Sequence, residues 1–330
     1  MKKIKIAQIG MNTLSHSVQI FNSIAKQNDI FEVVGYVLPE NERQRLPHRM
    51  KTLEGYKELT LDEVLSDPEI EAVTIETEEI YCTKYALLAA QAGKHIHMEK
   101  PGGREIEDFE KLIETVKKTG KVFHTGYMYR YNPMVCELME KVKAGELGEI
   151  ISVEAQMNCL HNAVNRQWLS DFPGGMMFYL GCHLVDLVLQ LQGMPEKITA
   201  LNRCTGLDGV TAQDFGMAVM EYPNGVSFVK TTAIEKGGYL RRQLVVTGSK
   251  GMVEIKPLEY GPEADMHTEQ TVYMNDGWND HGEHSISESF DRYDNMLAAF
   301  AAMARGEKVN PWTPDYELEL YKAVLRCCGA

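Results

Sequence analysis

Residues 3–16, KIKIAQIGMNTLSH, hold the first clear structural signal of the chain. The apolar run at 4–9 predicts a short buried strand, and Gly10 ends it. Residues 15–27 then carry apolar side chains at helical spacing. A strand that passes through a glycine turn into a helix is how a strand–helix–strand unit begins, so this stretch predicts an α/β fold.

The same alternation continues through the first part of the chain. Further strands are predicted at 32–38, 72–77 and 95–98, and a helix at 80–92. Thr60 and Glu63 have the spacing of a capping box, which predicts a short helix. Strands that alternate with helices pair in parallel through right-handed crossovers. We therefore expect a doubly wound sheet whose ligands lie at the carboxyl ends of its strands.

The pattern changes after about residue 130. A helix at 133–144 is followed by longer segments of alternating polarity, with separators at 223–225 and 248–251 that are typical of hairpin turns. The predicted strands are 149–158, 213–222, 225–234, 241–247, 251–255 and 270–274, and the predicted helices are 284–305 and 314–328. We therefore expect two domains. Residues 1–125 form the first, and residues 126–330 form an α+β domain with a mainly antiparallel open sheet, its last helix free to pack back toward the first domain.

Composition excludes several partners. With a formal net charge of -13, the chain lacks the concentrated basic surface that binds nucleic acid. The apolar run at the start is too short for a signal peptide and no uncharged stretch would span a bilayer, so we expect a cytoplasmic protein without membrane contact. The cysteines lack paired metal-ligand spacing, which favours reduced thiols and no metal site.

Residues 92–103, AGKHIHMEKPGG, carry the most specific chemical signal. The predicted strand ends at Glu99-Lys100-Pro101. A lysine at the carboxyl end of a strand, followed by a stiff proline, would point its ammonium into the ligand cleft. Taken alone, Lys100 has a second interpretation of equal weight, a solvated surface lysine.

A second segment, residues 174–195, carries Tyr179, His183 and Asp186 at positions i, i+4 and i+7. That spacing places all three side chains on one face of a helix. A hydrogen-bonded core histidine is the alternative interpretation of His183. A lysine in the cleft and a histidine on a polar helix face together favour an acid/base pair.

A third segment, residues 160–168, reads LHNAVNRQW and combines His161 and Trp168 with amide side chains. Aromatic rings stack on the C–H groups of sugars and amides pair with hydroxyls, so the segment favours sugar recognition. An ordered surface loop is the equally weighted alternative.

Four motifs in chain order resemble those of the Gfo/Idh/MocA oxidoreductases. They are EKP at 99–101 after the fifth strand, GYMYRYNP at 126–133, GELGEI at 145–150, and Gly181-x-His183-x-x-Asp186 in a helix. The resemblance covers essentially the whole chain. It implies an N-terminal Rossmann domain, a C-terminal open sheet for substrate and oligomer contacts, and NAD(P)-dependent oxidation or reduction of sugars, cyclitols or their derivatives. Carried over by position, Lys100 contacts cofactor and substrate, and His183 is the acid/base.

The chain also departs from the family pattern. The resemblance implies glycines at Asn12 and Ser15, an acid at Leu38, a proline at Glu78, a histidine at Cys82 and an aspartate at Tyr179. Asparagine enters the left-handed conformation easily, and Ser15 can cap the following helix with its hydroxyl. The phosphate site can therefore survive the loss of both glycines.

The change at Leu38 bears on the cofactor. A carboxylate there would bind the ribose hydroxyls, and leucine cannot. Glu40 is a possible substitute, whereas Arg43 or Arg45 would suit a 2′-phosphate. NAD is favoured, with NADP left open.

We therefore predict an NAD(P)-dependent dehydrogenase or reductase that transfers a hydride between a nicotinamide cofactor and the hydroxyl or carbonyl carbon of a sugar, glycoside or cyclitol, and that forms a homo-oligomer, a dimer or tetramer. The alternative is a non-catalytic dinucleotide- or sugar-binding regulatory protein with the same fold. The predicted catalytic residues are Lys100 and His183; the predicted substrate-binding residues are Arg130, Asn132, His161, Trp168, Tyr179 and Asp186; the predicted cofactor-binding residues are Gly10, Met11, Asn12, Thr13, Leu38, Thr77, Glu78, Glu99 and Lys100.

Overall fold

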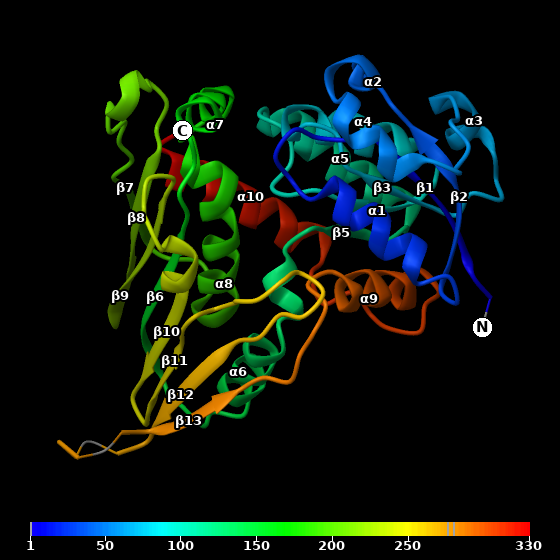
Figure 1. Ribbon diagram of the computed structural model, residues 1–330. Helices are drawn as coiled ribbons and strands as arrows, with labels where there is room; N and C mark the ends of the chain where they lie inside the picture. The colour runs from blue at the N-terminus through cyan, green and yellow to red at the C-terminus, as the bar shows by residue number, and fades with distance from the viewer. Residues whose placement is uncertain (1, 276, 280) are drawn as a thin grey trace. The chain divides into compact units, whose positions relative to one another are not determined.

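The computed structural model describes residues 2–275, 277–279 and 281–330, which form two compact units (Figure 1). The N-terminal unit consists of Met1–Tyr127 and Tyr293–Tyr321. The C-terminal unit consists of Met128–Arg292 and Lys322–Ala330. A segment near the end of the chain thus belongs to the unit that the beginning of the chain builds.

Five parallel strands form the sheet of the N-terminal unit, in the order β2-β1-β3-β4-β5. They are β1 (Ile4–Ile9), β2 (Phe31–Val37), β3 (Ala72–Ile75), β4 (His95–Met98) and β5 (Phe123–Thr125). This arrangement confirms the predicted doubly wound parallel sheet. The prediction that Lys100 follows the fifth strand is wrong, because it follows β4. Glu58 makes a single bridge to Tyr36, which adds no strand between β2 and β3.

Helices cover both faces of this sheet. They are α1 (Ser17–Lys26), α2 (Glu42–Arg45), a 3-10 segment at Pro47–Leu53, α3 (Leu61–Ser66), α4 (Glu79–Gln91), α5 (Ile106–Thr119), α9 (Asp294–Ala304) and the first part of α10 (Pro314–Cys328). Phe123 of β5 packs edge-on against Phe109 of α5, while the next residue, His124, stacks on Phe300 of α9. Adjacent strand residues point to opposite faces, so α5 and α9 lie on opposite sides of the sheet.

Eight strands form the sheet of the C-terminal unit, in the order β13-β12-β11-β10-β6-β9-β8-β7. They are β6 (Ile150–Asn158), β7 (Lys197–Ala200), β8 (Phe215–Tyr222), β9 (Gly225–Thr232), β10 (Gln243–Gly248), β11 (Met252–Ile255), β12 (Glu269–Tyr273) and β13 (Glu283–Ile286). Among the described strands, β6 and β9 pair in parallel and the other neighbours are antiparallel, which confirms the predicted open sheet. Both predicted hairpin turns are confirmed, because Tyr222 pairs with Gly225 and Thr247 with Met252.

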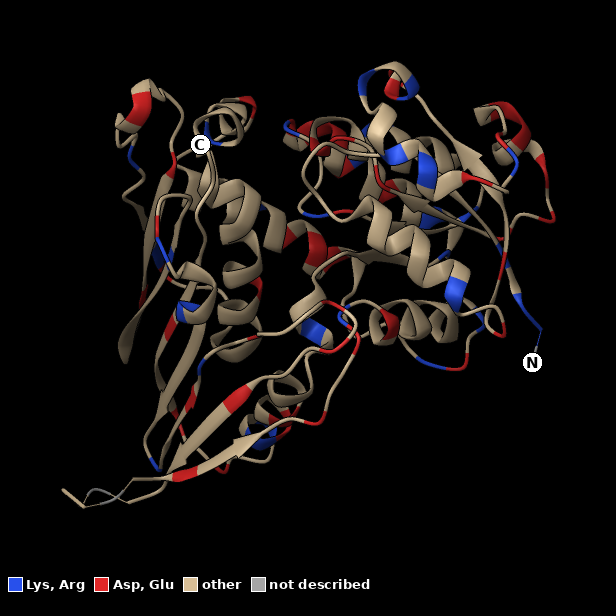
Figure 2. Ribbon diagram, viewed as in Figure 1, with Lys and Arg blue, Asp and Glu red and all other residues tan. Residues whose placement is uncertain are grey.

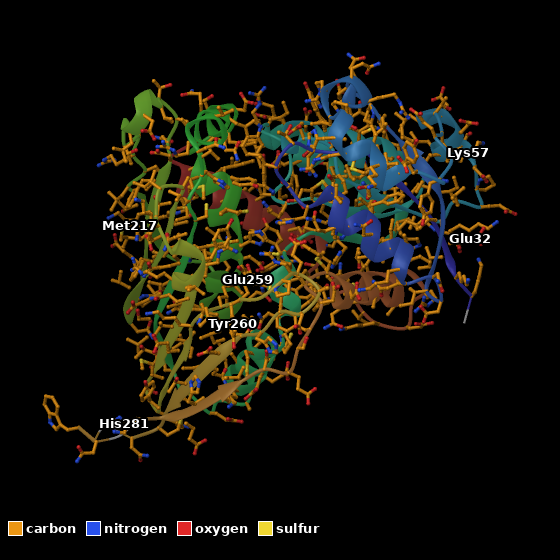
Figure 3. The ribbon with its side chains drawn as sticks, viewed as in Figure 1. Glu32, Lys57, Met217, Glu259, Tyr260 and His281 are labelled. Carbon is orange, nitrogen blue, oxygen red and sulfur yellow. The ribbon has the colours of Figure 1, made fainter. Side chains whose placement is uncertain are left out.

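The two faces of this sheet differ. Helix α8 (Cys182–Gln192) packs against β6 and β9 on one face; the other helices of the unit are α6 (Pro133–Lys143), α7 (Ala163–Trp168) and the end of α10. The opposite face carries half-buried apolar side chains, with Val219 of β8 directly across from Phe228 of β9. Met217 lies on the same face and points away from the helices in Figure 3.

The predicted helix at 284–305 is wrong in its first part. Residues Glu283–Ile286 form β13 and pair with β12, and the helix begins only at Asp294. All four residues of β13 are exposed, so their polarity gave no strand signal. Acidic and basic residues are interspersed over both units (Figure 2). Of the helices in the described ranges, none combines the length and the apolar character needed to cross a membrane.

Candidate active site

A tight turn at Gly10 links β1 to α1 at the carboxyl ends of the strands. Gly10 has a φ of +93°, and its N–H donates to the carbonyl oxygen of Val37 at the end of β2 over 2.8 Å. A Cβ atom at Gly10 would lie 2.4 Å from Cγ2 of Thr77, which follows β3. Only glycine therefore fits where the ends of three strands meet.

The interpretations of Asn12 and Ser15 are wrong. In the described chain, the non-glycine residues with positive φ are Glu40, Asn41 and Asp208, so Asn12 is not left-handed. Helix α1 begins at Ser17 with His16 in the N-cap position, which leaves Ser15 outside the helix. Instead, the hydroxyl of Ser17 accepts a hydrogen bond from the backbone N–H of Asn12 (3.3 Å) and donates one to Oδ1 of Asn12 (3.2 Å). The turn therefore holds its shape through residues that the glycine pattern does not include.

Three glutamates, which we call the loop glutamates, each accept a hydrogen bond from a different residue of the loop after Gly10. The pairs are the N–H of Met11 with Glu42 Oε2 (2.9 Å), the hydroxyl of Thr13 with Glu78 Oε1 (2.5 Å), and the hydroxyl of Ser15 with Glu79 Oε1. Burial raises the pKa of Glu42 to about 8 and that of Glu79 to about 7. Three donors of the loop, from Met11, Thr13 and Ser15, thus already have acidic partners within the protein.

The segment after β2 has contacts of its own. The Glu40 carboxylate accepts from Lys84 Nζ (2.6 Å) and from the Tyr85 hydroxyl (2.7 Å), both on α4. Arg45 donates from Nε to the carbonyl oxygen of Glu40 (3.0 Å). Leu38, the residue after β2, is half-buried. The carboxylate of Glu40 is therefore engaged by α4, which argues against its use as the ribose-binding acid.

Lys100 directly follows β4 and is buried, with 3% of its surface exposed. Its Nζ lies 3.3 Å from Oε1 of Glu99. The alternative of a solvated surface lysine is therefore wrong. A buried ammonium held beside a carboxylate at a strand end can hold an anion or polarise an oxygen.

Tyr179 belongs to a π-helical turn, Met177–Gly181, that precedes α8, whereas His183 and Asp186 lie in α8. The three residues are therefore not part of one regular α-helix, and their position on a common face stays a prediction. The ring of Tyr179 packs edge-on against Trp168, with centroids 5.0 Å apart.

His183 is 3% exposed and lies edge-on to Tyr129, with ring centroids 5.6 Å apart. The Tyr129 hydroxyl donates to Glu259 Oε1 (2.8 Å), which also accepts hydrogen bonds from the guanidinium groups of Arg242 and Arg292. Burial alone would raise the pKa of Glu259, but the two guanidinium groups hold it below its usual range. These residues fix the position of Tyr129 beside His183. Sequence reasoning missed this support: Tyr129 lies inside the quoted motif, whereas Glu259 carried no signal.

Arg130 and Asp186 form a buried bidentate ion pair. The guanidinium donates from Nε (3.0 Å) and Nη2 (2.8 Å) to the two carboxylate oxygens, and Gln190 donates to the same carboxylate (2.8 Å). Asn132 caps α6 and donates to the Thr268 hydroxyl (2.7 Å). Arg130, Asn132 and Asp186 thus have structural partners inside this unit. Their contact with substrate stays a prediction.

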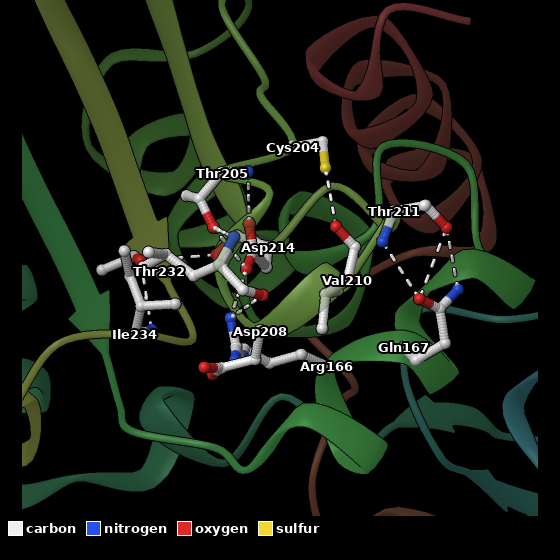
Figure 4. Close-up of polar contacts among 11 residues, drawn as sticks. Arg166, Gln167, Cys204, Thr205, Asp208, Val210, Thr211, Asp214, Thr232 and Ile234 are labelled. Atoms are coloured by element: carbon white, nitrogen blue, oxygen red, sulfur yellow. Dashed lines mark hydrogen bonds and ion pairs between the residues drawn. The ribbon is translucent and has the colours of Figure 1, made fainter.

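The segment predicted to recognise sugars, residues 160–168, includes helix α7, which holds the loop between β7 and β8. Arg166 of α7 pairs with Asp214 (3.0 Å) and Asp208, and Thr205 donates to Asp214 (2.8 Å), as Figure 4 shows. This network ties α7 to the loop between β7 and β8. The guanidinium of Arg166 therefore holds that loop in place.

The other two residues predicted in this segment, Trp168 and His161, are both half-buried. Trp168 packs edge-on against Phe172, with centroids 4.7 Å apart, in addition to its contact with Tyr179. His161 is half-buried, and burial together with the charge of Arg242 lowers its pKa. His161 is therefore a neutral imidazole near pH 7, able to donate and accept hydrogen bonds.

The strand ends of the N-terminal unit fit a dinucleotide. The turn at Gly10 leads from the carboxyl end of β1 to the N-terminus of α1, a position that favours a diphosphate. Lys100 and Glu99 follow β4 at the same edge of the sheet. No group of three His, Cys, Asp or Glu side chains within the described ranges is arranged to hold a metal ion.

Comparisons with known proteins place both units. Residues 4–127 match the model described as the oxidoreductase family, NAD-binding Rossmann fold, and residues 135–254 match the GFO/IDH/MocA C-terminal domain. An uncharacterized oxidoreductase of Rhizobium meliloti is 28% identical over 62% of this chain and 61% of its own length. The chain thus spans less than two thirds of that relative.

Two further similarities concern proteins whose activity is named. Trans-1,2-dihydrobenzene-1,2-diol dehydrogenase of Bos taurus is 27% identical over 66% of this chain and 68% of its own length. The solved structure of levoglucosan dehydrogenase in complex with NADH and levoglucosan has a TM-score of 0.79 at 17% identity and covers 99% of this chain and 98% of its own. At that identity the similarity to the solved structure concerns the fold.

Proposed function

Because the chain belongs to the Gfo/Idh/MocA oxidoreductase family, we propose that it transfers a hydride between a nicotinamide cofactor and a carbon bearing a hydroxyl or carbonyl group in a sugar, glycoside or cyclitol. The named relatives support this substrate class. Levoglucosan is an anhydrosugar, and the dihydrobenzene diol is a ring with neighbouring hydroxyls. A cyclic compound with adjacent hydroxyls is common to both.

The cofactor in this proposal is NAD or NADP, held by the strand-end loops of the N-terminal unit. Gly10, Met11, Asn12, Thr13, Leu38, Thr77, Glu78, Glu99 and Lys100 are the residues we propose to contact it. When bound, the nicotinamide ring supplies the carbon that gives or accepts the hydride. A side chain at Gly10 would collide with Thr77 and distort the turn.

In the oxidative direction, His183 accepts the proton of the substrate hydroxyl, and the Lys100 ammonium stabilises the negative charge that develops on that oxygen. In the reductive direction His183 returns the proton. The proposal requires both side chains to act on one substrate oxygen. Tyr129, fixed by its bond to Glu259, would hold the His183 ring in place.

The burial of Lys100 carries this proposal. A lysine is rarely buried unless it is paired, and Lys100 is 3% exposed beside Glu99 at a strand end where α/β sheets bind ligands. A surface lysine kept for its charge alone would face water. An ammonium held ready for an oxygen or an anion accounts for this placement.

Turnover by the purified protein tests the proposal. NAD, NADP and their reduced forms are mixed in turn with a panel of anhydrosugars, aldoses, inositols and cyclic diols or their ketones, and nicotinamide absorbance is followed. We expect turnover with at least one compound, and much slower turnover in Lys100→Met and His183→Ala. Binding of a cofactor with no turnover on any compound would contradict the proposal and favour the non-catalytic alternative.

A further inference from the structure

The loop after Gly10 has the position in which a Rossmann domain binds the diphosphate of its cofactor, yet the three loop glutamates already accept hydrogen bonds from three of its donors. The Met11 N–H, the Thr13 hydroxyl and the Ser15 hydroxyl each donate to a different loop glutamate. Two of the carboxyl groups belong to the start of α4, and one belongs to α2. Carboxyl groups from α2 and α4 thus accept the hydrogen bonds that the loop would otherwise donate to an anionic ligand.

The second oxygen of each loop glutamate makes this arrangement costly. Oε1 of Glu42, Oε2 of Glu78 and Oε2 of Glu79 are buried and have no hydrogen-bond partner within the described residues. A buried carboxylate with an unsatisfied oxygen is unfavourable, and a protonated carboxyl is less so. Burial therefore favours the neutral form of Glu42 and Glu79, whose pKa values it raises.

We propose that the loop glutamates stand in for the diphosphate in the nucleotide-free protein, and that binding a dinucleotide is therefore coupled to proton uptake by Glu42 and Glu79. An arriving diphosphate competes for the loop donors and adds negative charge beside the carboxyl groups. Each carboxyl that is still ionised must then take up a proton or withdraw. The coupling concerns nucleotide binding alone and does not depend on the proposed substrate.

The charges around the two glutamates allow such coupling. Glu79 faces Ser15 of the loop, Lys100 and Glu99 after β4, and its neighbour Glu78; Glu76 at the end of β3 also interacts with it. Glu42 faces Met11 of the loop, Arg45 and Glu40 on its own segment, and Glu78. Arg49 braces the loop from the 3-10 segment by donating to the Thr13 carbonyl (2.6 Å). Cations are therefore present to attract a diphosphate, while the acids around them oppose it.

The protonation range of these groups lies near neutral pH. Burial places the pKa of Glu79 at about 7 and that of Glu42 at about 8, so both change charge between about pH 6 and 9. A nearby diphosphate raises both pKa values further, because it disfavours a second negative charge. The bound form then holds more protons than the free form, so affinity falls as pH rises, tenfold per pH unit for each proton taken up.

Calorimetric titration with NADH at pH 7.5, in two buffers of different ionisation enthalpy, measures the coupling directly. The difference in binding heat between the buffers gives the number of protons taken up. We expect between about half a proton and one proton for the wild-type protein, and an affinity that falls severalfold from pH 7 to pH 8.5. In the double variant Glu42→Gln, Glu79→Gln, both effects should disappear, and affinity at pH 8.5 should exceed that of the wild type.

Glu114→Gln is the matched control, because Glu114 is an exposed glutamate of the same unit, on α5, and should behave as the wild type. Each single variant, Glu42→Gln and Glu79→Gln, is titrated as well, so that a fold defect in the double variant does not decide the outcome; circular dichroism checks their folding. Binding heat that is the same in both buffers for the wild type overturns the proposal. So does proton uptake that persists in the folded variants, or the absence of any NADH binding. None of these outcomes depends on turnover, so they are distinct from a failure of the proposed reaction.

Discussion

Replacing Asp186 by asparagine tests whether the buried pair with Arg130 supports the fold of the C-terminal unit. The side chains of Arg130 and Asp186 are 0% and 1% exposed, and two charged hydrogen bonds of 3.0 and 2.8 Å join them. Asparagine keeps the shape but removes the negative charge and turns one acceptor into a donor that faces the guanidinium. The charge of Arg130 is then left in a dry interior.

The expected loss of unfolding free energy is about 3–5 kcal/mol, the usual cost of leaving one buried charge without its partner. A typical domain has about 5–15 kcal/mol in total, so this loss would shift the unfolding midpoint markedly. The double variant Arg130→Met, Asp186→Leu removes both charges and keeps the volume. It should recover most of the loss, because apolar replacements of buried pairs are often close to neutral.

Urea unfolding followed by tryptophan fluorescence and circular dichroism measures these differences; Trp168 lies in the same unit. The control is Glu140→Gln, which breaks the pair with Lys143 at 2.8 Å, where both side chains are more than 70% exposed. It should cost less than about 1 kcal/mol. If Asp186→Asn is as stable as this control, the structural role is refuted. A raised KM for substrate in that stable variant would support the predicted substrate contact instead.

Four further predictions concern both units. The folded protein holds the carboxyl proton of Glu42 more tightly than the unfolded chain does, so the free energy of unfolding should fall as pH rises from about 4.5 to about 8. Glu42→Gln should remove up to roughly 5 kcal/mol of this loss. Urea unfolding at pH 5 and pH 8.5 measures the difference, and an equal effect of the substitution at both pH values would contradict the prediction. Gly10→Ala should weaken NADH binding at least tenfold in calorimetry, since its Cβ would enter the backbone after β3; unchanged affinity would refute the tight turn. Lys100→Met should weaken NADH binding only a little and His183→Ala should spare it, but both should lower turnover, the latter by about 10²–10⁴-fold, and full turnover in either would reject its catalytic role. The half-buried face around Met217 should join a second copy of the chain, so light scattering should find a dimer or tetramer that Met217→Glu weakens; a monomer at micromolar concentration would oppose this.

Local patterns in the sequence were sufficient for most of the fold. The strand ending at Gly10, the capping box of Thr60 and Glu63, and both hairpin turns are confirmed because each depends on residues close in the chain. The strand at Glu283–Ile286 was missed because its hydrogen bonds come from β12 rather than from its own polarity. Pairing partners of this kind leave little trace in a local pattern.

The roles of Lys100 and His183 in the candidate site stay predictions, and the contacts that support them carried no sequence signal. Lys100 and His183 follow from motifs, and the structure shows both to be buried. The bonds of Glu42 to Met11 and of Tyr129 to Glu259 join residues 31 and 130 positions apart, so no spacing rule could find them. Ser15 and Asn12 were misread because propensity alone does not reveal that the hydroxyl of Ser17 fastens the turn.

The π turn at Met177–Gly181 has a consequence for how the C-terminal unit can diverge among relatives. A π turn holds one residue more than an α turn, so deleting a single residue here would return the segment to a regular helix and reposition the side chains of the turn itself. Tyr179 would leave the aromatic cluster with Trp168, while His183 and Asp186 would keep their places in α8. A one-codon deletion in this turn therefore changes the packing around Trp168 more thoroughly than a substitution, and leaves His183 in α8.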